Sequence, residues 1–220
     1  MSCEGASRLA PLELPGPAGR LEAILQECDS GLPAFAALVC HPHPLFGGTM
    51  HNKVVQRMAA TLHDMGGTTL RFNFRGVEKS EGRFDEGRGE VDDARAALDW
   101  LRRHRPGTPL LAAGFSFGSR VAARVAAEEA DVERVVLVAP PLAGGGFEAM
   151  RTSPVPKLVL QGTADDLCPL AALQAEFPGW AEPKRLVTID GATHFFDRQL
   201  GELAKALLQG LPALPQRRAS

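Results

Sequence analysis

The segment Pro109–Glu129 constrains the fold of this chain more than any other. It begins with a short apolar run, continues with the letters GFSFG (114–118), and ends in an alanine-rich helical pattern. A strand that turns sharply into a helix around a serine needs small residues on both sides, because side chains there would crowd the strained turn. The pattern also occurs by chance in a chain with 23 glycines among 220 residues, so the rest of the sequence must support it.

Apolar runs alternate with helical periodicities from residue 35 onward, which predicts a doubly wound, mostly parallel α/β sheet of about eight strands with helices on both faces. A hairpin signal at Gly16–Gly19 precedes this region. We expect a single domain over residues 1–220, with residues 1–8 and 211–220 flexible. The predicted strands are Leu9–Leu14, Arg20–Glu27, Phe35–Cys40, Thr68–Phe74, Leu110–Ala113, Arg134–Ala139, Lys157–Gln161 and Arg185–Ile189, and the predicted helices are His51–Met65, Glu90–His104, the one after Ser116, Leu170–Phe177 and Phe196–Leu208.

Composition excludes several classes of function. The net charge of −2 gives no general attraction to nucleic acid or to an anionic membrane. We see no uninterrupted apolar stretch of about 18 residues and no apolar core of a signal peptide near the start. The four cysteines show no zinc-ligand spacing and indicate reduced thiols of a cytoplasmic protein: Cys3, Cys28, Cys40 and Cys168. The oligomeric state stays open.

Polar residues follow the ends of several predicted strands. Because ligands of such sheets bind at the carboxyl ends of the strands, these residues are the candidates for a site. They include HPHPLFGG (41–48), Ser116, Asp165 and His194. A serine, an acid and a histidine in this chain order are typical of α/β-hydrolases.

Five ordered segments resemble the α/β-hydrolases, and in particular small bacterial serine hydrolases, over nearly the whole chain. The resemblance implies the α/β-hydrolase fold and a serine-dependent hydrolase without a cofactor. Relatives tend to read G-V-G-x-S where this chain has Glu78 in GVEKS (76–80), which leaves the shape of that loop open. The five segments are HPHPLFGGTMHNK (41–53), RFNFRGV (71–77), GFSFG (114–118), GTADD (162–166) and THFF (193–196).

The predicted catalytic residues are Ser116, Asp165 and His194. A serine hydroxyl is a poor nucleophile at neutral pH and needs a base, and His194 is the only histidine that follows Ser116 in the chain. An acid must fix the imidazole tautomer. Asp165 matches the G-x-x-D-x-x-x-P pattern that the resemblance implies. Asp166 is the alternative, although we expect it to cap the next helix or to face solvent.

The tetrahedral intermediate of such a reaction needs two N–H donors. Phe117 supplies one from the start of its helix. The second should come from the loop after Phe35–Cys40, where the prolines have no N–H and leave His43 or Leu45. We favour His43, because it matches the third residue of the family's H-G-x pattern.

The H-x-H spacing of His41 and His43 also suggests a metal site, with His51, Asp165 and His194 as further ligands. This hypothesis leaves the glycines around the serine unexplained, so we predict no metal. The sequence contains neither a P-loop nor a dinucleotide-binding fingerprint.

Two further groups of polar residues have structural explanations. Asn73 and Arg75 are expected to brace the loops of the site, although Arg75 could instead meet an anionic substrate. The acidic residues at the start of the second predicted helix should form a solvated face that suits the helix dipole: Glu86, Glu90, Asp92 and Asp93.

The substrate prediction rests on a short connection. Only residues 140–156 separate two of the later strands, which is too little for a helical lid. An open site buries little of a long acyl chain, so it favours small soluble esters and a carboxylesterase activity. A thioesterase, a peptidase or a catalytically silent binding protein on the same fold are the alternatives.

Overall fold

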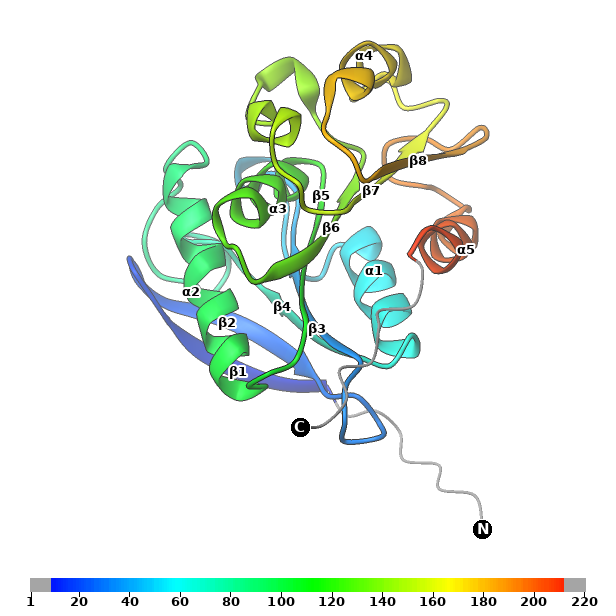
Figure 1. The fold of residues 1–220 in the computed structure, drawn as a ribbon. Coiled ribbons are helices and arrows are strands. Elements are labelled where there is room, and N and C mark those ends of the chain that lie inside the picture. Colours follow the sequence, from blue (N-terminus) through cyan, green and yellow to red (C-terminus); the bar gives the residue numbers. More distant parts are fainter. Residues whose placement is uncertain (1–8, 212–220) are drawn as a thin grey trace.

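The computed structural model describes residues 9–211, which form an open sheet of eight strands in the order β1-β2-β4-β3-β5-β6-β7-β8 (Figure 1). The hairpin strands β1 and β2 are antiparallel to each other and β2 is antiparallel to β4, whereas all later pairs are parallel. The predicted α/β class and strand count are therefore confirmed. The strands are β1 (Leu9–Gly16), β2 (Gly19–Gln26), β3 (Phe35–Cys40), β4 (Gly67–Phe72), β5 (Leu110–Phe115), β6 (Val132–Val138), β7 (Lys157–Gly162) and β8 (Lys184–Ile189).

Helices cover both faces of the sheet. In Figure 1, α1 and α5 lie together on one face, and α2 and α3 lie together on the other. Within residues 9–211, none of the helices has both the length and the apolar character that crossing a lipid bilayer requires. The helices are α1 (Lys53–Asp64), α2 (Arg88–His104), α3 (Phe117–Glu128), α4 (Leu170–Glu176) and α5 (Leu200–Gly210), with 3₁₀ turns η1 (Pro44–Phe46), η2 (Leu142–Gly144), η3 (Glu148–Arg151) and η4 (Phe177–Gly179).

Two apolar cores result from the alternation of side chains along the central strands. In β3, Leu38 points into the core under α2 and α3, while its neighbours Ala37 and Val39 point into the core under α1 and α5. All six residues of β3 are buried, which explains why this strand has no polar alternation in the sequence.

Two sequence predictions need correction at the C-terminal end of the chain. The last helix begins at Leu200 and not at Phe196, because Phe196 and Arg198 have φ values of 51° and 62° that no helix accepts. Residues 1–8 and 212–220, which were expected to be flexible, lie outside the described residues. Leu211, the first residue of the predicted flexible end, is buried in the core under α1 and α5.

Candidate active site

Ser116 lies at the sharp turn between β5 and α3, with φ 53° and ψ −121°. This conformation costs about 1–3 kcal/mol for a residue with a side chain. The flanking glycines make the turn possible: a Cβ at Gly114 would lie 2.0 Å from the Gly118 carbonyl oxygen, and one at Gly118 would lie 2.4 Å from the Cys40 carbonyl oxygen. The Ser116 N–H donates to the Val138 carbonyl of the neighbouring strand at 2.9 Å, which fixes the turn against the sheet.

The three predicted catalytic side chains meet in one chain of hydrogen bonds. The distance from His194 Nε2 to Ser116 Oγ is 3.1 Å, and His194 Nδ1 lies 2.9 Å from Asp165 Oδ2. The Asp165 side chain is fully buried, and 7 % of the His194 side chain is exposed. The Phe115 ring packs against the imidazole, with 5.0 Å between ring centroids. The arrangement orients His194 so that one ring nitrogen faces the serine and the other faces the acid.

The Asp165 carboxylate is held by backbone and side-chain donors from its own loop. Its Oδ1 accepts N–H groups from Leu167 at 3.0 Å and Cys168 at 2.8 Å, and its Oδ2 accepts from Gln161 Nε2 at 3.0 Å. Burial by itself would raise the pKa of the Asp165 carboxyl, but the hydrogen bonds from His194 and from these donors outweigh it and hold the pKa below its usual value. Asp165 is therefore ionised at neutral pH, whereas its neighbour Asp166 is exposed.

Gln161, whose side chain braces the acid, is not among the residues that the sequence predicted. Its Nε2 also donates to the Cys168 carbonyl at 2.8 Å, so the amide ties the end of β7 to the Asp165 loop. Its Oε1 is one of two fully buried side-chain polar atoms without a partner in the described residues. The signal was present in the sequence, because Gln161 is the one uncharged polar residue in the otherwise apolar strand LVLQG, four positions before the acid.

The loop after β3 contains two histidines that both use ring nitrogens structurally. His41 is buried, with Nδ1 2.6 Å from the Pro42 carbonyl and Nε2 accepting the Phe74 N–H at 3.0 Å. Burial lowers the pKa of His41 to about 3, so the ring is neutral. His43 Nδ1 accepts the Leu45 N–H at 3.2 Å. These bonds occupy both ring nitrogens of His41, so an H-x-H metal site would lack one of its two histidine ligands.

The two candidates for the second oxyanion donor differ in their hydrogen bonding. The Leu45 N–H is occupied by His43 Nδ1, whereas the His43 N–H has no acceptor among the described residues. The rings of His43 and Phe117 lie 5.0 Å apart between centroids, so the loop after β3 and the start of α3 are in contact. Gly48 keeps this loop compact, because a Cβ there would lie 2.2 Å from the Pro42 carbonyl oxygen.

One group of side chains in residues 9–211 has ligand atoms that lie close enough together to hold a metal ion: Asp165, Cys168 and His194. Two of the three are already hydrogen-bonded to each other. Burial, followed by the nearby Asp165 charge, raises the pKa of the Cys168 thiol to about 12, and a protonated thiol is a poor metal ligand. The group fits the serine arrangement better than a metal centre.

Comparison with known proteins agrees with this fold. A family model described as an alpha/beta hydrolase domain matches residues 38–207. The chain belongs to the α/β-hydrolase family. This α/β-hydrolase is 37% identical to an uncharacterized protein of Rickettsia prowazekii, over 87% of this chain and 84% of that protein.

Two solved structures resemble this α/β-hydrolase over almost their whole length. One is an alpha-beta serine hydrolase homologue from Coxiella burnetii, at 39% identity and TM-score 0.88, covering 92% of this chain and 97% of that one. The other is an α/β serine hydrolase without a lid from Xanthomonas campestris, at 38% identity and TM-score 0.87, covering 94% of this chain and 97% of that one.

In the part of the chain that the structure describes, no lid domain covers the site, as the short connection predicted. The segment between β6 and β7 forms only the 3₁₀ turns η2 and η3. Large apolar side chains are instead exposed in loops that carry the site residues. They are Leu45 and Phe46 after His43, Leu167 after Asp165, and Phe195 after His194.

Near the start of α2, the structure agrees with the sequence prediction for one polar residue and differs from it for two others. Arg75 is a bracing residue, because its guanidinium forms a bidentate ion pair with Asp93 at 2.8 and 3.0 Å. Asp93 and Glu90 were expected on a solvated face, but both are fully buried. The Glu90 carboxylate accepts the N–H groups of Asp85 and Gly87 at 2.9 and 2.7 Å, so the loop before α2 folds over the helix start.

In the loop GVEKS (76–80), the backbone at position 78 is left-handed although the residue there is a glutamate. Glu78 has φ 48°, a conformation that glycine adopts without strain. Its carboxylate accepts a hydrogen bond from Asn73 Nδ2 at 2.6 Å. Asn73 in turn accepts the Met50 N–H at 2.8 Å, so this asparagine braces the end of the His43 loop.

Proposed function

We propose that this α/β-hydrolase is a serine carboxylesterase that cleaves small, soluble esters of short acyl groups through an acyl-enzyme on Ser116, without a cofactor. The observation that carries the proposal is the hydrogen-bonded chain from Ser116 Oγ through His194 to the buried Asp165 carboxylate. We expect the enzyme to act in the cytoplasm, where buried free thiols such as Cys40 stay reduced.

In the acylation step, Ser116 Oγ attacks the carbonyl carbon of the ester while His194 Nε2 takes the hydroxyl proton. The carbonyl π bond breaks and its electron pair moves to the oxygen. The N–H groups of His43 and Phe117 stabilise this oxyanion. When the tetrahedral intermediate collapses, the C–O bond to the leaving group breaks and His194 returns the proton to the departing alcohol.

Deacylation repeats these steps with water as the nucleophile. His194 takes a proton from water, the hydroxide forms a bond to the acyl carbon, and the proton returns to Ser116 Oγ as the carboxylic acid leaves. Asp165 accepts a hydrogen bond from His194 Nδ1–H throughout and stays ionised, so it keeps Nε2 free as the base and stabilises the imidazolium. Gln161 holds Asp165 in place for this role.

Two observations support small, partly apolar substrates. The exposed side chains of Leu45, Phe46, Leu167 and Phe195 offer apolar contacts at the loops of the site. The short turns between β6 and β7 provide no lid that would enclose a long acyl chain. A substrate would therefore gain from a few methylene groups, at about 0.8 kcal/mol each, and gain little from further ones.

Labelling with a fluorophosphonate tests the proposal. Intact-mass measurement should show one adduct on the wild type and none on Ser116→Ala. A series of p-nitrophenyl esters from acetate to palmitate should then give the highest kcat/KM at short chain lengths. Absence of an adduct on the wild type would reject the serine mechanism in favour of a silent binding protein, and a maximum at palmitate would reject the short-acyl assignment.

A further inference from the structure

A groove of about 570 Å³ lies between α1 and the β1–β2 hairpin, and its lining includes none of Ser116, Asp165 or His194. It exists because α1 packs on β3, β4 and β5, while the outer hairpin extends beyond the helix. Its walls are partly apolar, with Ile24 from β2, Ala60 from α1 and Leu200 from the start of α5.

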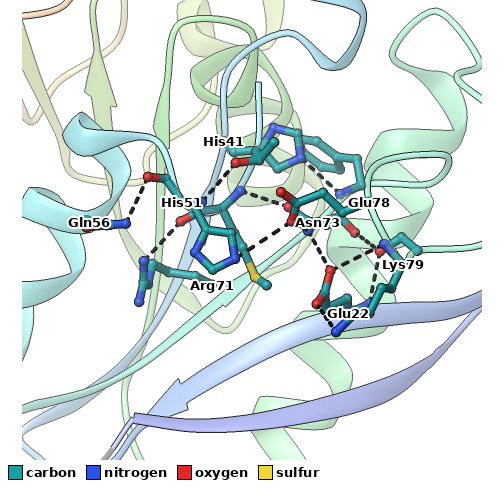
Figure 2. Close-up of polar contacts among 12 residues, drawn as sticks. Glu22, His41, His51, Gln56, Arg71, Asn73, Glu78 and Lys79 are labelled. Atoms are coloured by element: carbon teal, nitrogen blue, oxygen red, sulfur yellow. Dashed lines mark hydrogen bonds and ion pairs between the residues drawn. The ribbon is translucent and has the colours of Figure 1, made fainter. Parts of the chain in front are cut away.

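Arg71 is an unusual side chain to find in this groove. Strand alternation directs Phe72 into the core under α2 and α3, so Arg71 points to the opposite face, where it lies across from Ile24 in the register of β2 and β4. The residue is 5 % exposed, and burial lowers the pKa of its guanidinium. Figure 2 shows the side chain reaching from β4 toward the segment that contains His51 and Gln56.

The Arg71 guanidinium has few partners for a buried charge. Within residues 9–211 it forms one hydrogen bond, from Nη1 to the Met50 carbonyl at 3.0 Å, and no ion pair with a carboxylate. Its other nitrogens are not among the fully buried unpartnered atoms of the described chain, so they retain some solvent exposure, and Arg71 is part of the lining of the groove. A guanidinium has five N–H donors, and a buried one is stable only when most of them are satisfied.

Among the other basic residues in the lining, Arg57 adds positive charge that no carboxylate in the described part of the chain neutralises. Arg57, on the exposed side of α1, likewise has no ion pair within the described residues. Lys53 is neutralised by its salt bridge to Asp197. His51 Nε2 lies 3.7 Å from a Glu78 carboxylate oxygen, a contact drawn in Figure 2. Among residues 9–211, the lining of the groove therefore contains two arginines without a carboxylate partner and no acidic residue.

We propose that this groove binds a small organic oxyanion, a carboxylate or a phosphate, with the anionic group on Arg71 and an apolar part against Ile24, Ala60 and Leu200. The planar fork of a guanidinium matches the two oxygens of either group, and the resulting bonds are stronger than those between neutral partners. The ligand would supply the counter-ion that the protein lacks here. Arg57 adds charge at the entrance.

Isothermal titration calorimetry with benzoate and with phenyl phosphate tests the proposal. These probes share an apolar ring, so the tighter one identifies the preferred anionic group. Arg57→Ala should lower the affinity about three- to fivefold, as expected for one exposed charge. Arg103→Ala is the matched control, because Arg103 is also exposed on a helix and lines no part of the groove, so its affinity should equal that of the wild type.

Arg71→Met should lower the affinity by more than tenfold. Because this change also removes the bond to Met50, circular dichroism checks its fold, and the Arg57 comparison remains valid if it unfolds. Ser116→Ala should bind both probes as the wild type does, which separates this site from the serine chemistry. The proposal is wrong if neither probe binds, or if Arg57→Ala and Arg103→Ala weaken binding equally.

Discussion

Replacement of Asp165 by asparagine tests the geometry of the site most directly. The two backbone N–H groups of Leu167 and Cys168 both donate to Oδ1, so the amide oxygen of an asparagine must take that position. Its NH₂ group then faces Gln161 Nε2, a donor, and His194 Nδ1. The histidine avoids a clash of donors only by losing the Nδ1 proton and carrying its proton on Nε2.

The size of the effect follows from this change of tautomer. With a proton on Nε2, His194 cannot accept the hydroxyl proton of Ser116 across the 3.1 Å contact. The corresponding loss in serine hydrolases is about 10⁴-fold in kcat, or about 5 kcal/mol of transition-state stabilisation. KM should change little, because the acid does not contact the ester.

The measurement is kcat and KM for p-nitrophenyl acetate, together with the rate of fluorophosphonate labelling. Asp166→Asn is a matched control, because it makes the same chemical change at the adjacent exposed carboxylate and should stay within about twofold of the wild type. Thermal melts establish that both variants fold. A loss of less than tenfold for Asp165→Asn, or a large loss for Asp166→Asn, would refute the assignment.

Three further variants or conditions test the fold around the site. Gly118→Ala should lower the free energy of unfolding by more than about 2 kcal/mol and abolish fluorophosphonate labelling, because its Cβ would lie 2.4 Å from the Cys40 carbonyl oxygen. Gly201→Ala, with open space around the added Cβ, should be neutral or stabilising. Urea unfolding compares the stability of the two variants. The pKa of Asp165 lies below its ordinary 3.8, so the ionised carboxylate stabilises the fold above about pH 4, and this contribution disappears as the pH falls through the lower folded-state pKa. Urea unfolding from about pH 6 to pH 2.5 should therefore show a steeper loss for the wild type than for Asp165→Asn, and parallel curves would contradict the shift. Glu78→Gly should be more stable than Glu78→Ala by about 1 kcal/mol in thermal melts, because only glycine adopts the left-handed backbone at φ 48° without strain. The reverse order of stability would count against strain at this position.

The fold could be predicted well from the sequence because its central strands are short, mostly apolar and buried on both faces. Phe35–Cys40 was predicted with the bounds that the structure has, since a short apolar run without alternation is typical of a strand buried on both faces. The predicted start of the last helix was wrong, because local periodicity does not reveal that Phe196 and Arg198 have left-handed backbones.

The candidate catalytic residues were also accessible from the sequence, whereas their supporting residues were not. Ser116, Asp165 and His194 each follow a strand, and the carboxyl ends of parallel strands meet at one edge of the sheet. Gln161 and the pair of Arg75 with Asp93 act through contacts between distant segments, which no local pattern contains. For the same reason, two acidic residues of α2 appeared solvated and are buried.

The sequence by itself determined the class of fold, the sharp turn at Ser116 and the order of the three candidate catalytic residues, because each depends on local backbone sterics or on the alternation of strands and helices. Only the tertiary structure decided which donors surround Asp165, that the Leu45 N–H is occupied by His43, and that Arg71 is buried beside a groove with no carboxylate of the described residues as its partner. The physical reason is that burial and hydrogen-bond partners depend on segments far apart in the chain, and these meet only when the sheet and its two layers of helices have packed.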